Sequence, residues 1–131
     1  MEIRCVDWVN PADMKALYED AGWWEGDDSS YLNDAVKGSC VFVGAFEAGK
    51  MIGMGRALSD GVSDAYIQDI VVLTSHRGQG IGKKIIKALV LNLKEKGVDW
   101  IGLVAVPGSQ KFYKALGFKV LEGHVPLKYE E

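Results

Sequence analysis

The sequence predicts an α/β (or α+β) fold in which strands and helices alternate around a single mixed sheet. Three observations lead to this fold class. The chain has 131 residues, one domain's worth, so residues 1–131 are expected to form a single domain around one hydrophobic core. Hydrophobic residues make up 48% of it and charged residues 25%, as in ordinary globular proteins. Its centre has the order strand, glycine-rich turn, long helix, strand.

The first third of the chain predicts one strand and two helices. The strand is expected over residues 2–9. The first helix covers residues 10–22, where Asn10 suits the N-cap and Pro11 suits the first turn. The second helix is short, covers residues 29–38 and ends on a glycine.

A hairpin, a strand and the longest helix follow. Residues 39–58 contain two apolar segments around a turn at 47–50, which is the pattern of a β-hairpin. Residues 65–73 predict a further strand. The long helix begins at Ile81, because apolar side chains then recur at helical spacing, and Gly97 is placed to end it.

The last part of the chain predicts one more strand–helix unit and two extended segments. Residues 100–106 are apolar and indicate a strand, and residues 108–116 indicate a short helix. Residues 118–120 and 124–129 are expected to be the last extended segments of the fold.

Composition excludes several classes of protein. Cys5 and Cys40 lie outside any Cys/His cluster, which favours a reducing compartment and argues against a structural metal site. The net charge of −3 argues against a nucleic-acid or membrane-surface partner. No apolar run approaches the roughly 20 residues that cross a bilayer, and the first residues lack the pattern of a signal peptide. We therefore expect a cytoplasmic protein that binds neither nucleic acid nor membrane.

The glycine-rich turn Ser75–Gly82 predicts an anion site. The first N–H groups of a helix have no carbonyl partner within the helix, and together with the helix dipole they attract anions. Gly80 and Gly82 would let a phosphate approach the backbone. Arg77, Lys83 and Lys84 would add positive charge around the same point. The alternative is that the glycines serve only a tight turn and the lysines are solvated.

Two common phosphate-binding motifs do not fit this turn. The Walker pattern would need glycine at Arg77 and Ser or Thr at Lys84. The dinucleotide fingerprint would need a third glycine at Lys83. The pattern that does fit is Arg-x-x-Gly-x-Gly, formed by Arg77, Gly80 and Gly82.

This pattern lies within Asp69–Leu89, DIVVLTSHRGQGIGKKIIKAL, which resembles the acetyl-CoA-binding motif of the GCN5-related N-acetyltransferase (GNAT) family. Downstream, Gln110–Phe118, QKFYKALGF, resembles the second signature of that family. The resemblance covers Gly38–Phe118. It implies a mixed, mostly antiparallel sheet of about six to seven strands, splayed at its central parallel strands and flanked by about four helices.

The resemblance implies acetyl-CoA as co-substrate and direct transfer of its acetyl group to an amine in a ternary complex. A backbone N–H near Val71 or Val72 would stabilise the developing oxyanion. Many members have Asn at the position of Val106 and Ala at that of Ser109, so a side-chain contact to CoA is either missing or supplied by Ser109. The implied cofactor-binding residues are Ile70, Val71, Val72, Arg77, Gly78, Gln79, Gly80, Ile81, Gly82, Lys83, Ser109 and Phe112.

Two catalytic residues are implied in the same way. Tyr113 occupies the position of a tyrosine that protonates the departing CoA thiolate, a role that suits a phenol at neutral pH. The alternative is a core aromatic residue. The general base is open, because Gln68 stands where polyamine-acetylating members have Glu. Asp69 is the candidate base, and Tyr66 acting through a water, or a water chain alone, are the alternatives.

The acceptor is expected to be a primary amine on a small molecule, or a lysine or N-terminus of a protein. The aromatic and acidic cluster of Trp23, Trp24, Glu25, Asp27 and Asp28 would suit a cationic amine, although at least one of the tryptophans is expected in the core. A sensor that binds CoA without chemistry is the alternative function. The oligomeric state is open, with a homodimer as one outcome.

Overall fold

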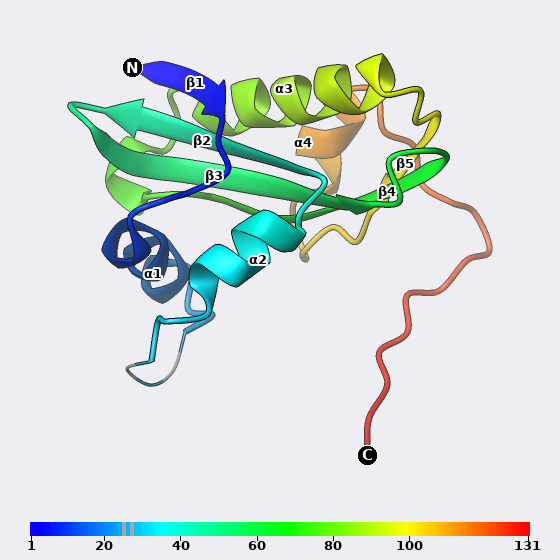
Figure 1. Ribbon diagram of the computed structural model, residues 1–131. Coiled ribbons are helices and arrows are strands. Elements are labelled where there is room, and N and C mark those ends of the chain that lie inside the picture. Colours follow the sequence, from blue (N-terminus) through cyan, green and yellow to red (C-terminus); the bar gives the residue numbers. More distant parts are fainter. Residues whose placement is uncertain (25, 27) are drawn as a thin grey trace.

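The computed structural model describes residues 1–24, 26 and 28–131. In these residues one five-stranded sheet is flanked by four α-helices, as the fold class predicts (Figure 1). The strand order is β1-β2-β3-β4-β5, and neighbours are antiparallel except β4 and β5, which are parallel. The strands are β1 (Glu2–Cys5), β2 (Val41–Glu47), β3 (Lys50–Ser59), β4 (Asp64–Val72) and β5 (Trp100–Leu103).

The helices are α1 (Pro11–Asp20), α2 (Leu32–Gly38), α3 (Ile81–Glu95) and α4 (Gln110–Ala115), with a 3₁₀ turn, η1 (Thr74–His76), before α3. No helix in the described part of the chain is long and apolar enough to cross a membrane. Helix α3 covers one face of the sheet, and α1 and α2 cover the other (Figure 1). Buried side chains such as Leu89 fill the first interface, and Met14 and Val36 fill the second.

Local signals in the sequence produce most of these elements. The Asn10 side chain accepts a hydrogen bond from the backbone N–H of Ala12 at 3.0 Å and so caps α1, as predicted. Strand β1 is shorter than expected, because the Asn33 side chain takes both backbone groups of Val9, at 2.9 Å each, in place of a strand partner. Gly97, at φ +89°, ends α3 as predicted.

Helix α3 lies unusually close to the sheet over β3. A Cβ placed on Gly55 would collide with the side chain of Ile70 and would lie 2.8 Å from that of Ile85 and 3.0 Å from that of Leu89. A Cβ on Gly53 would lie 3.1 Å from the Ile85 side chain. A side chain at Gly55 would force these neighbours to shift, and one at Gly53 would require a smaller adjustment of Ile85, so glycine at both positions favours this close approach of helix and sheet.

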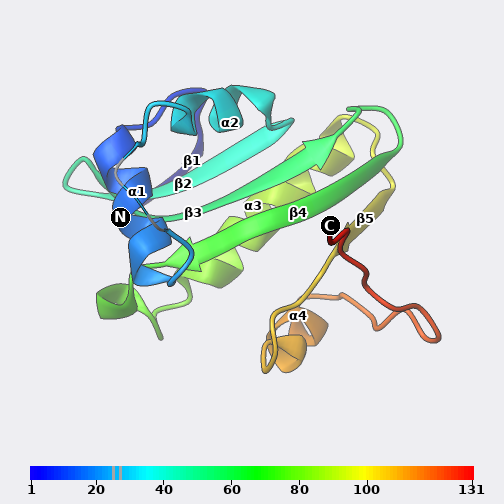
Figure 2. The same cartoon turned by 90° about the horizontal axis from the view of Figure 1, so that it is seen from below.

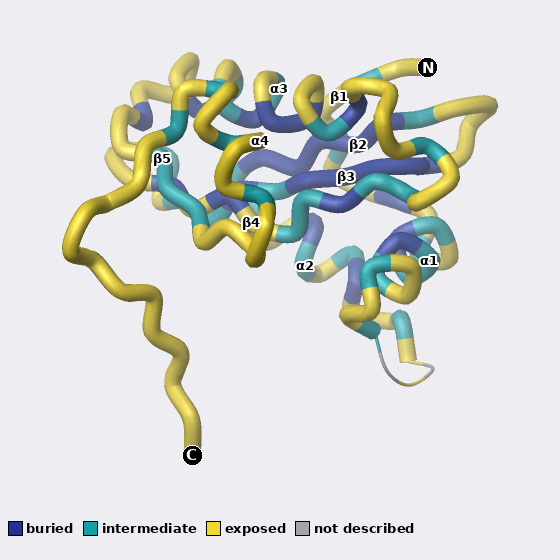
Figure 3. The backbone as a smooth tube through the Cα atoms, turned by 180° about the vertical axis from the view of Figure 1, so that it is seen from behind, coloured by how far each residue is buried: buried dark blue, intermediate teal, exposed yellow. Residues whose placement is uncertain are grey.

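The sheet has fewer strands than the six to seven expected. Residues 118–120 and 124–129 form no strand and pair with none in the described residues. Every residue from 119 to 131 is exposed, and Figure 3 shows this segment running away from the body. An alternating pattern favours an extended backbone, but pairing depends on where the chain is directed, and a turn at Gly123 (φ +76°) directs it away from the sheet.

Strand β5 is also shorter than the predicted 100–106. It ends at Leu103, whose partner in β4 is Ile67. Beyond that pair β4 is irregular, because Asp69 has a φ of +56° and the register with β3 shifts between Met54 and Arg56. Residues 104–106 consequently have no pairing partner in β4.

Candidate active site

Strands β4 and β5 separate in the middle of the molecule (Figure 2). Their pairing ends at Ile67 and Leu103, whereas β4 continues to Val72 and remains paired with β3 on its other side. A pocket of about 300 Å³ lies beyond the last pair. It is lined by Trp23, Tyr66, Ile67, Gln68, Asp69, Ile70, Leu103, Val104, Val106 and Tyr113. The pocket therefore brings together both predicted catalytic residues, Asp69 and Tyr113, which are 44 positions apart in the sequence.

The glycine turn forms an open cradle at the start of α3. Gly78 and Gly80 have φ values of +78° and +77°, a region that strains other residues. A Cβ on either would meet no described atom within 4 Å, so the space in front of the backbone is free. Gly80 is the N-cap of α3, and no side chain in the described residues caps this end. The first N–H groups of the helix are thus directed at an open space, which fits a phosphate.

Helix α4 leans against this cradle. A Cβ on Gly82 would lie 3.5 Å from the Phe112 ring and 3.9 Å from the Val72 side chain. The end of β4, the first turn of α3 and the aromatic face of α4 therefore meet at one point. Phe112 is half-exposed there and presents ring surface to anything that runs from the pocket to the cradle.

Asp20, at the end of α1, anchors the start of the cradle. Its Oδ2 accepts hydrogen bonds from the Thr74 backbone N–H at 2.8 Å and from the Thr74 hydroxyl at 2.9 Å. These bonds, and then the nearby Arg77, hold the pKa of Asp20 below its usual value. Arg77 donates from Nε to the Val72 carbonyl at 3.1 Å, and its Nη2 lies 3.7 Å from Asp20. The predicted pyrophosphate-binding arginine is thus tied to both α1 and β4.

Tyr113 lies on α4 with its ring half-buried. It packs edge-on against Phe112, with ring centroids 5.0 Å apart, and against Phe118 at 5.8 Å. Burial raises the pKa of the Tyr113 phenol, so the hydroxyl carries its proton at neutral pH. The ring is also a core aromatic, since it packs against the cluster under α3. The position of Tyr113 is compatible with both interpretations of the sequence, a core aromatic residue and a catalytic residue. Its ring packs against its neighbours, and the residue also lines the pocket.

Asp69 lies at the irregularity in β4 and is held by two partners. Its Oδ2 accepts from the Arg56 Nε at 2.8 Å and from the Tyr18 hydroxyl at 3.0 Å. Burial, and then the Asp69 carboxylate, raise the pKa of Tyr18, which therefore donates in this pair. Asp69 reaches the pocket with a fixed orientation, in a charge-assisted network that spans α1, β3 and β4.

The profile of the Acetyltransferase (GNAT) family matches residues 2–118. The chain belongs to the GNAT acetyltransferase family. Members of this family transfer an acetyl group from acetyl-CoA, and the open cradle of this chain fits the phosphates of that cofactor.

Relatives with curated names include N-acetyltransferases. Serotonin N-acetyltransferase 2, chloroplastic, from Oryza sativa subsp. japonica is 42% identical over 71 residues, which cover 54% of this chain and 36% of that protein. Uncharacterized N-acetyltransferase ycf52 from Pyropia yezoensis is 30% identical over 114 residues, which cover 84% of this chain and 65% of that protein. The chain thus spans between about a third and about two thirds of the length of these relatives.

A solved GNAT structure agrees with the fold. The GNAT family acetyltransferase from Streptococcus pneumoniae TIGR4 superposes with a TM-score of 0.84 at 27% identity, over 99% of this chain and 97% of that one. The GNAT fold predicted from the two sequence signatures is therefore confirmed.

The predicted cofactor residues differ in how far they are exposed in this GNAT fold. The side chains of Val71 and Ile81 are 5% and 3% exposed and point into the core, so only their backbone is available to a ligand. The exposed group, whose atoms face solvent at the cradle, comprises Arg77, Gly78, Gln79, Gly80 and Lys83. Ser109 donates its hydroxyl to the Val106 carbonyl at 2.7 Å and so serves the turn before α4.

The aromatic residues before α2 divide between pocket and packing. Trp23 lines the pocket and is half-exposed. Trp24 is stacked between Tyr18 and Tyr31, with ring centroids 6.1 Å and 5.7 Å apart. Trp24 is thus the structural tryptophan of the pair.

Of the acidic residues in the same cluster, the structure describes only Asp28. Its carboxylate accepts from the Ser30 backbone and hydroxyl, at 3.0 Å and 2.6 Å, so it shapes the loop. Glu25 and Asp27, expected in the same pocket, lie outside the described residues.

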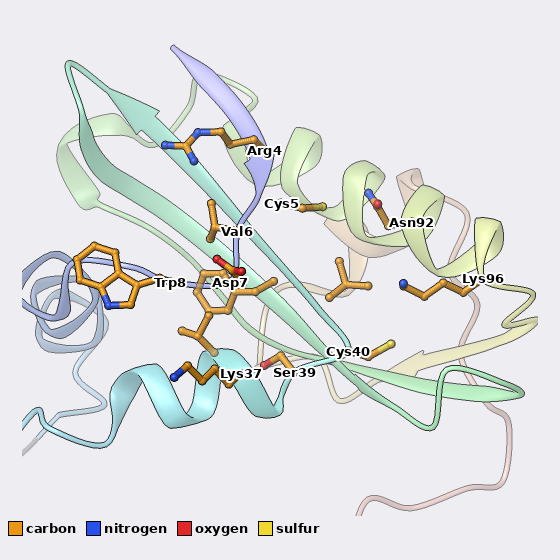
Figure 4. Close-up of a pocket in the computed structure, with 13 residues that line it drawn as sticks. Arg4, Cys5, Val6, Asp7, Trp8, Lys37, Ser39, Cys40, Asn92 and Lys96 are labelled. Carbon is orange, nitrogen blue, oxygen red and sulfur yellow. The ribbon is translucent and has the colours of Figure 1, made fainter.

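A larger hollow lies at the opposite edge of the sheet, where β1 leaves β2 (Figure 4). Its volume is about 570 Å³, and Cys5, Lys37 and Lys96 are among its lining residues. None of the residues predicted for the active site lines it. The residues predicted for catalysis, Asp69 and Tyr113, instead line the smaller pocket between β4 and β5.

Proposed function

We propose that this chain is an acetyl-CoA-dependent N-acetyltransferase that acts on a primary amine by direct attack in a ternary complex. One observation carries the proposal: the pocket that contains Tyr113 and Asp69 adjoins a cradle of free helix N–H groups. A cofactor with phosphates at one end and a thioester at the other would extend from the cradle to the pocket. The family match supports acetyl transfer in general, and the amine is our inference.

The cofactor-binding residues have distinct tasks in this proposal. The N–H groups that follow Gly78 and Gly80 bind the pyrophosphate, and Arg77 and Lys83 add charge. The backbone of Ile70–Val72, which β5 has left, binds the pantetheine arm. A backbone N–H near Val71 or Val72 stabilises the oxyanion that forms on the thioester carbonyl.

Tyr113 and Asp69 move the protons. The amine nitrogen forms a bond to the carbonyl carbon, the C–S bond breaks, and the Tyr113 hydroxyl gives its proton to the departing sulfur. The second proton, which the nitrogen loses as it becomes an amide, returns through water to the Tyr113 phenolate. Asp69 is the proposed acceptor of the proton that the substrate ammonium must lose first, with Tyr66 through a water as the alternative route. Trp23 and Tyr66 line the pocket beside Asp69, and aromatic faces next to a carboxylate favour a cationic acceptor.

The proposed acceptor classes are small amines and the amines of proteins, and one relative is named for serotonin. Both cysteines are free, and we keep a reducing, cytoplasmic setting as part of the proposal.

A thiol-release assay with acetyl-CoA tests the proposal. Serotonin, a polyamine and a lysine-containing peptide are offered in turn, and we expect thiol release above the amine-free rate with at least one of them. Acetyl-CoA binding without release on any amine would favour the sensor instead.

Cofactor choice is tested separately by thermal unfolding. A hundredfold excess of acetyl-CoA over its dissociation constant raises stability by about 2.7 kcal/mol. NADH and ATP at equal concentration should raise it much less. Equal shifts from all three ligands would contradict the assignment of the cradle to CoA.

A further inference from the structure

Asp69 lines the pocket between β4 and β5 and has an uncommon backbone conformation. Its φ is +56°, in the left-handed region that few residues other than glycine adopt. The register of β3 with β4 shifts close to it, between Met54 and Arg56. A strained conformation of this kind persists only where neighbouring groups hold it, and such residues gather at functional sites. The side chains that hold Asp69 are therefore candidates for a role in the reaction.

Two donors bind one and the same oxygen of the Asp69 carboxylate. The Arg56 Nε lies 2.8 Å from Oδ2, and the Tyr18 hydroxyl lies 3.0 Å from that atom. The side chain of Arg56 is 17% exposed and that of Asp69 27%, so water reaches this pair only in part. In the described residues, no group donates a hydrogen bond to the other oxygen, Oδ1. Because both carboxylate oxygens accept hydrogen bonds, Oδ1 is left for a donor that enters the pocket.

The two donors are themselves held by neighbouring elements. Arg56 lies on β3, and its Nη1 donates to the hydroxyl of Ser39, the C-cap of α2, at 3.5 Å. Tyr18 lies on α1, and its ring is stacked nearly parallel to Trp24, with ring centroids 6.1 Å apart. It also contacts Trp23 at 6.0 Å. The orientation of the Asp69 carboxylate is thus set jointly by α1, α2 and β3.

The other residues that line the pocket suit the organic part of a cationic ligand. Trp23 and Tyr66 line it with aromatic rings, and Ile67, Leu103 and Val104 line it with aliphatic side chains. A cation is attracted to aromatic faces and forms its strongest hydrogen bonds with a carboxylate. A primary ammonium group that enters this pocket would therefore find its charged partner in Oδ1 of Asp69.

We propose that Tyr18 and Arg56 are positioning residues, which hold Asp69 through Oδ2 so that Oδ1 binds the ammonium group of the acceptor. The inference rests on the proposed function, because it assigns the contact that the acceptor amine makes. Neither Tyr18 nor Arg56 is among the described residues that line the pocket, so both act through Asp69. The ring and the hydroxyl of Tyr18 then have separate tasks. The ring packs against Trp23 and Trp24, and the hydroxyl orients the carboxylate.

Tyr18→Phe tests the hydroxyl alone, because the ring and its stacking on Trp24 remain. The KM for an amine that the protein acetylates should rise at least about fivefold, while the KM for acetyl-CoA stays within about twofold. Tyr31→Phe is the matched control, because Tyr31 also stacks on Trp24, at 5.7 Å, and its hydroxyl has no hydrogen bond within the described residues. The control should change neither constant. Unchanged amine KM in a folded Tyr18→Phe protein would overturn the proposal.

A double-mutant cycle tests whether both donors act through Asp69. Arg56→Lys keeps the positive charge but loses the Nε donor, and it should raise the amine KM as Tyr18→Phe does. Asp69→Asn removes the carboxylate charge, and asparagine tolerates the φ of +56° at this position. In the Asp69→Asn protein, the effects of the other two substitutions on amine KM should largely disappear. Full, additive effects would mean that the two donors serve only the fold, and would overturn the proposal.

Amine binding without chemistry separates this inference from the proposed function. Serotonin, a polyamine and a lysine-containing peptide are titrated by calorimetry into protein saturated with CoA, which has no acetyl group to transfer. We expect at least one amine to bind, and Asp69→Asn to weaken its binding at least about tenfold. Such binding without thiol release from acetyl-CoA would support the ammonium contact and contradict the proposed function.

The opposite results are equally distinct. Thiol release with amine KM values that neither Tyr18→Phe nor Arg56→Lys alters would support the proposed function and overturn this inference. Binding that Asp69→Asn does not weaken, or no binding of any of the three amines, would also overturn it. Circular dichroism of each substituted protein checks that it remains folded.

Discussion

Residues 1–98 and residues 99–131 differ in how completely they are packed. Every buried apolar side chain, from Val9 to Val98, belongs to the first region, and none of the described residues 99–131 is buried (Figure 3). The first region holds four of the five strands, three helices and the proposed phosphate cradle. The second region holds Tyr113 on a short helix, together with the β5 wall of the pocket.

This difference separates two properties of the proposed enzyme. The cradle depends on the fixed positions of β4 and α3, which the core of the first region holds. The proton donor depends on α4, which is held by the packing of Tyr113, Leu116 and Phe118 against that core. Cofactor affinity and turnover should therefore be lost independently, by substitutions in different regions.

The largest expected effect is on the stability of the first region. Leu89→Ala removes a fully buried side chain of α3 and should lower the free energy of unfolding by about 2–5 kcal/mol. Leu91→Ala in the same helix is the control, because Leu91 is 59% exposed and its loss should cost less than about 0.5 kcal/mol. Urea unfolding measures both. Equal losses would mean that the two faces of α3 are not packed as differently as the burial indicates.

The next effect belongs to the second region. Tyr113→Phe keeps the ring and its contacts with Phe112 and Phe118, so acetyl-CoA affinity should stay within about twofold. Turnover should fall by about 10²- to 10⁴-fold, toward the lower end because a thiol leaves readily. Steady-state kinetics on the true amine, together with calorimetric binding, give the two numbers. Loss of affinity at unchanged turnover would make Tyr113 a binding residue.

Gly80→Val should lower acetyl-CoA affinity, whereas Tyr113→Phe should lower turnover. The side chain would occupy the open space in front of the cradle and adopt a strained φ near +77°, so acetyl-CoA affinity should fall at least about tenfold. Gly49→Val is the control, because Gly49 has a φ of +81° and similarly open space but lies in the β2–β3 turn. The control shares the backbone strain and should bind acetyl-CoA normally. Unchanged binding by a folded Gly80→Val protein would place the phosphates elsewhere.

The smallest effect concerns the pH dependence of the anchor at Asp20. Hydrogen bonds from Thr74 lower the pKa of Asp20 in the folded state, so the carboxylate stabilises the fold above its unfolded pKa near 3.8. This contribution is lost as pH falls from there through the lowered folded pKa. Asp20→Asn should therefore lower stability more at pH 6 than at pH 3, which flattens the acid end of the stability curve. Urea midpoints at pH 6 and pH 3 measure it, and an unaltered difference between them would contradict the role.

The sequence predicted the parts of the molecule that local chemistry determines. The cap at Asn10, the stripe of α3 and the glycines of the cradle each depend on residues within a few positions, and the structure places them as expected. The partners of the site residues are different. Asp20 and Thr74 are 54 positions apart and Tyr18 and Asp69 are 51 apart, so no local pattern pairs them.

The strand count failed for a related reason. The alternation in residues 124–129 indicates a strand but contains no information about whether any sheet edge is available to pair with it. Likewise, the apolar run 100–106 does not reveal that the pairing of β5 with β4 ends at Leu103 and Ile67. The sequence of a segment indicates its tendency to form a strand. Which strand it pairs with is seen only in the folded sheet.

The close contact between α3 and β3 gives the fold a mechanical property. Helix α3 has 15 residues and behaves as a rigid rod about 22 Å long. Gly55 lies beneath Ile85 and Leu89, near the middle of this rod, whereas the cradle lies at its tip. A methyl group at Gly55 would displace the ends of the Ile85 and Leu89 side chains, which pack on the underside of the rod. A residue of β3 thus influences how α3 packs on the sheet, and through the helix it can influence the position of the proposed phosphate cradle at its N-terminus.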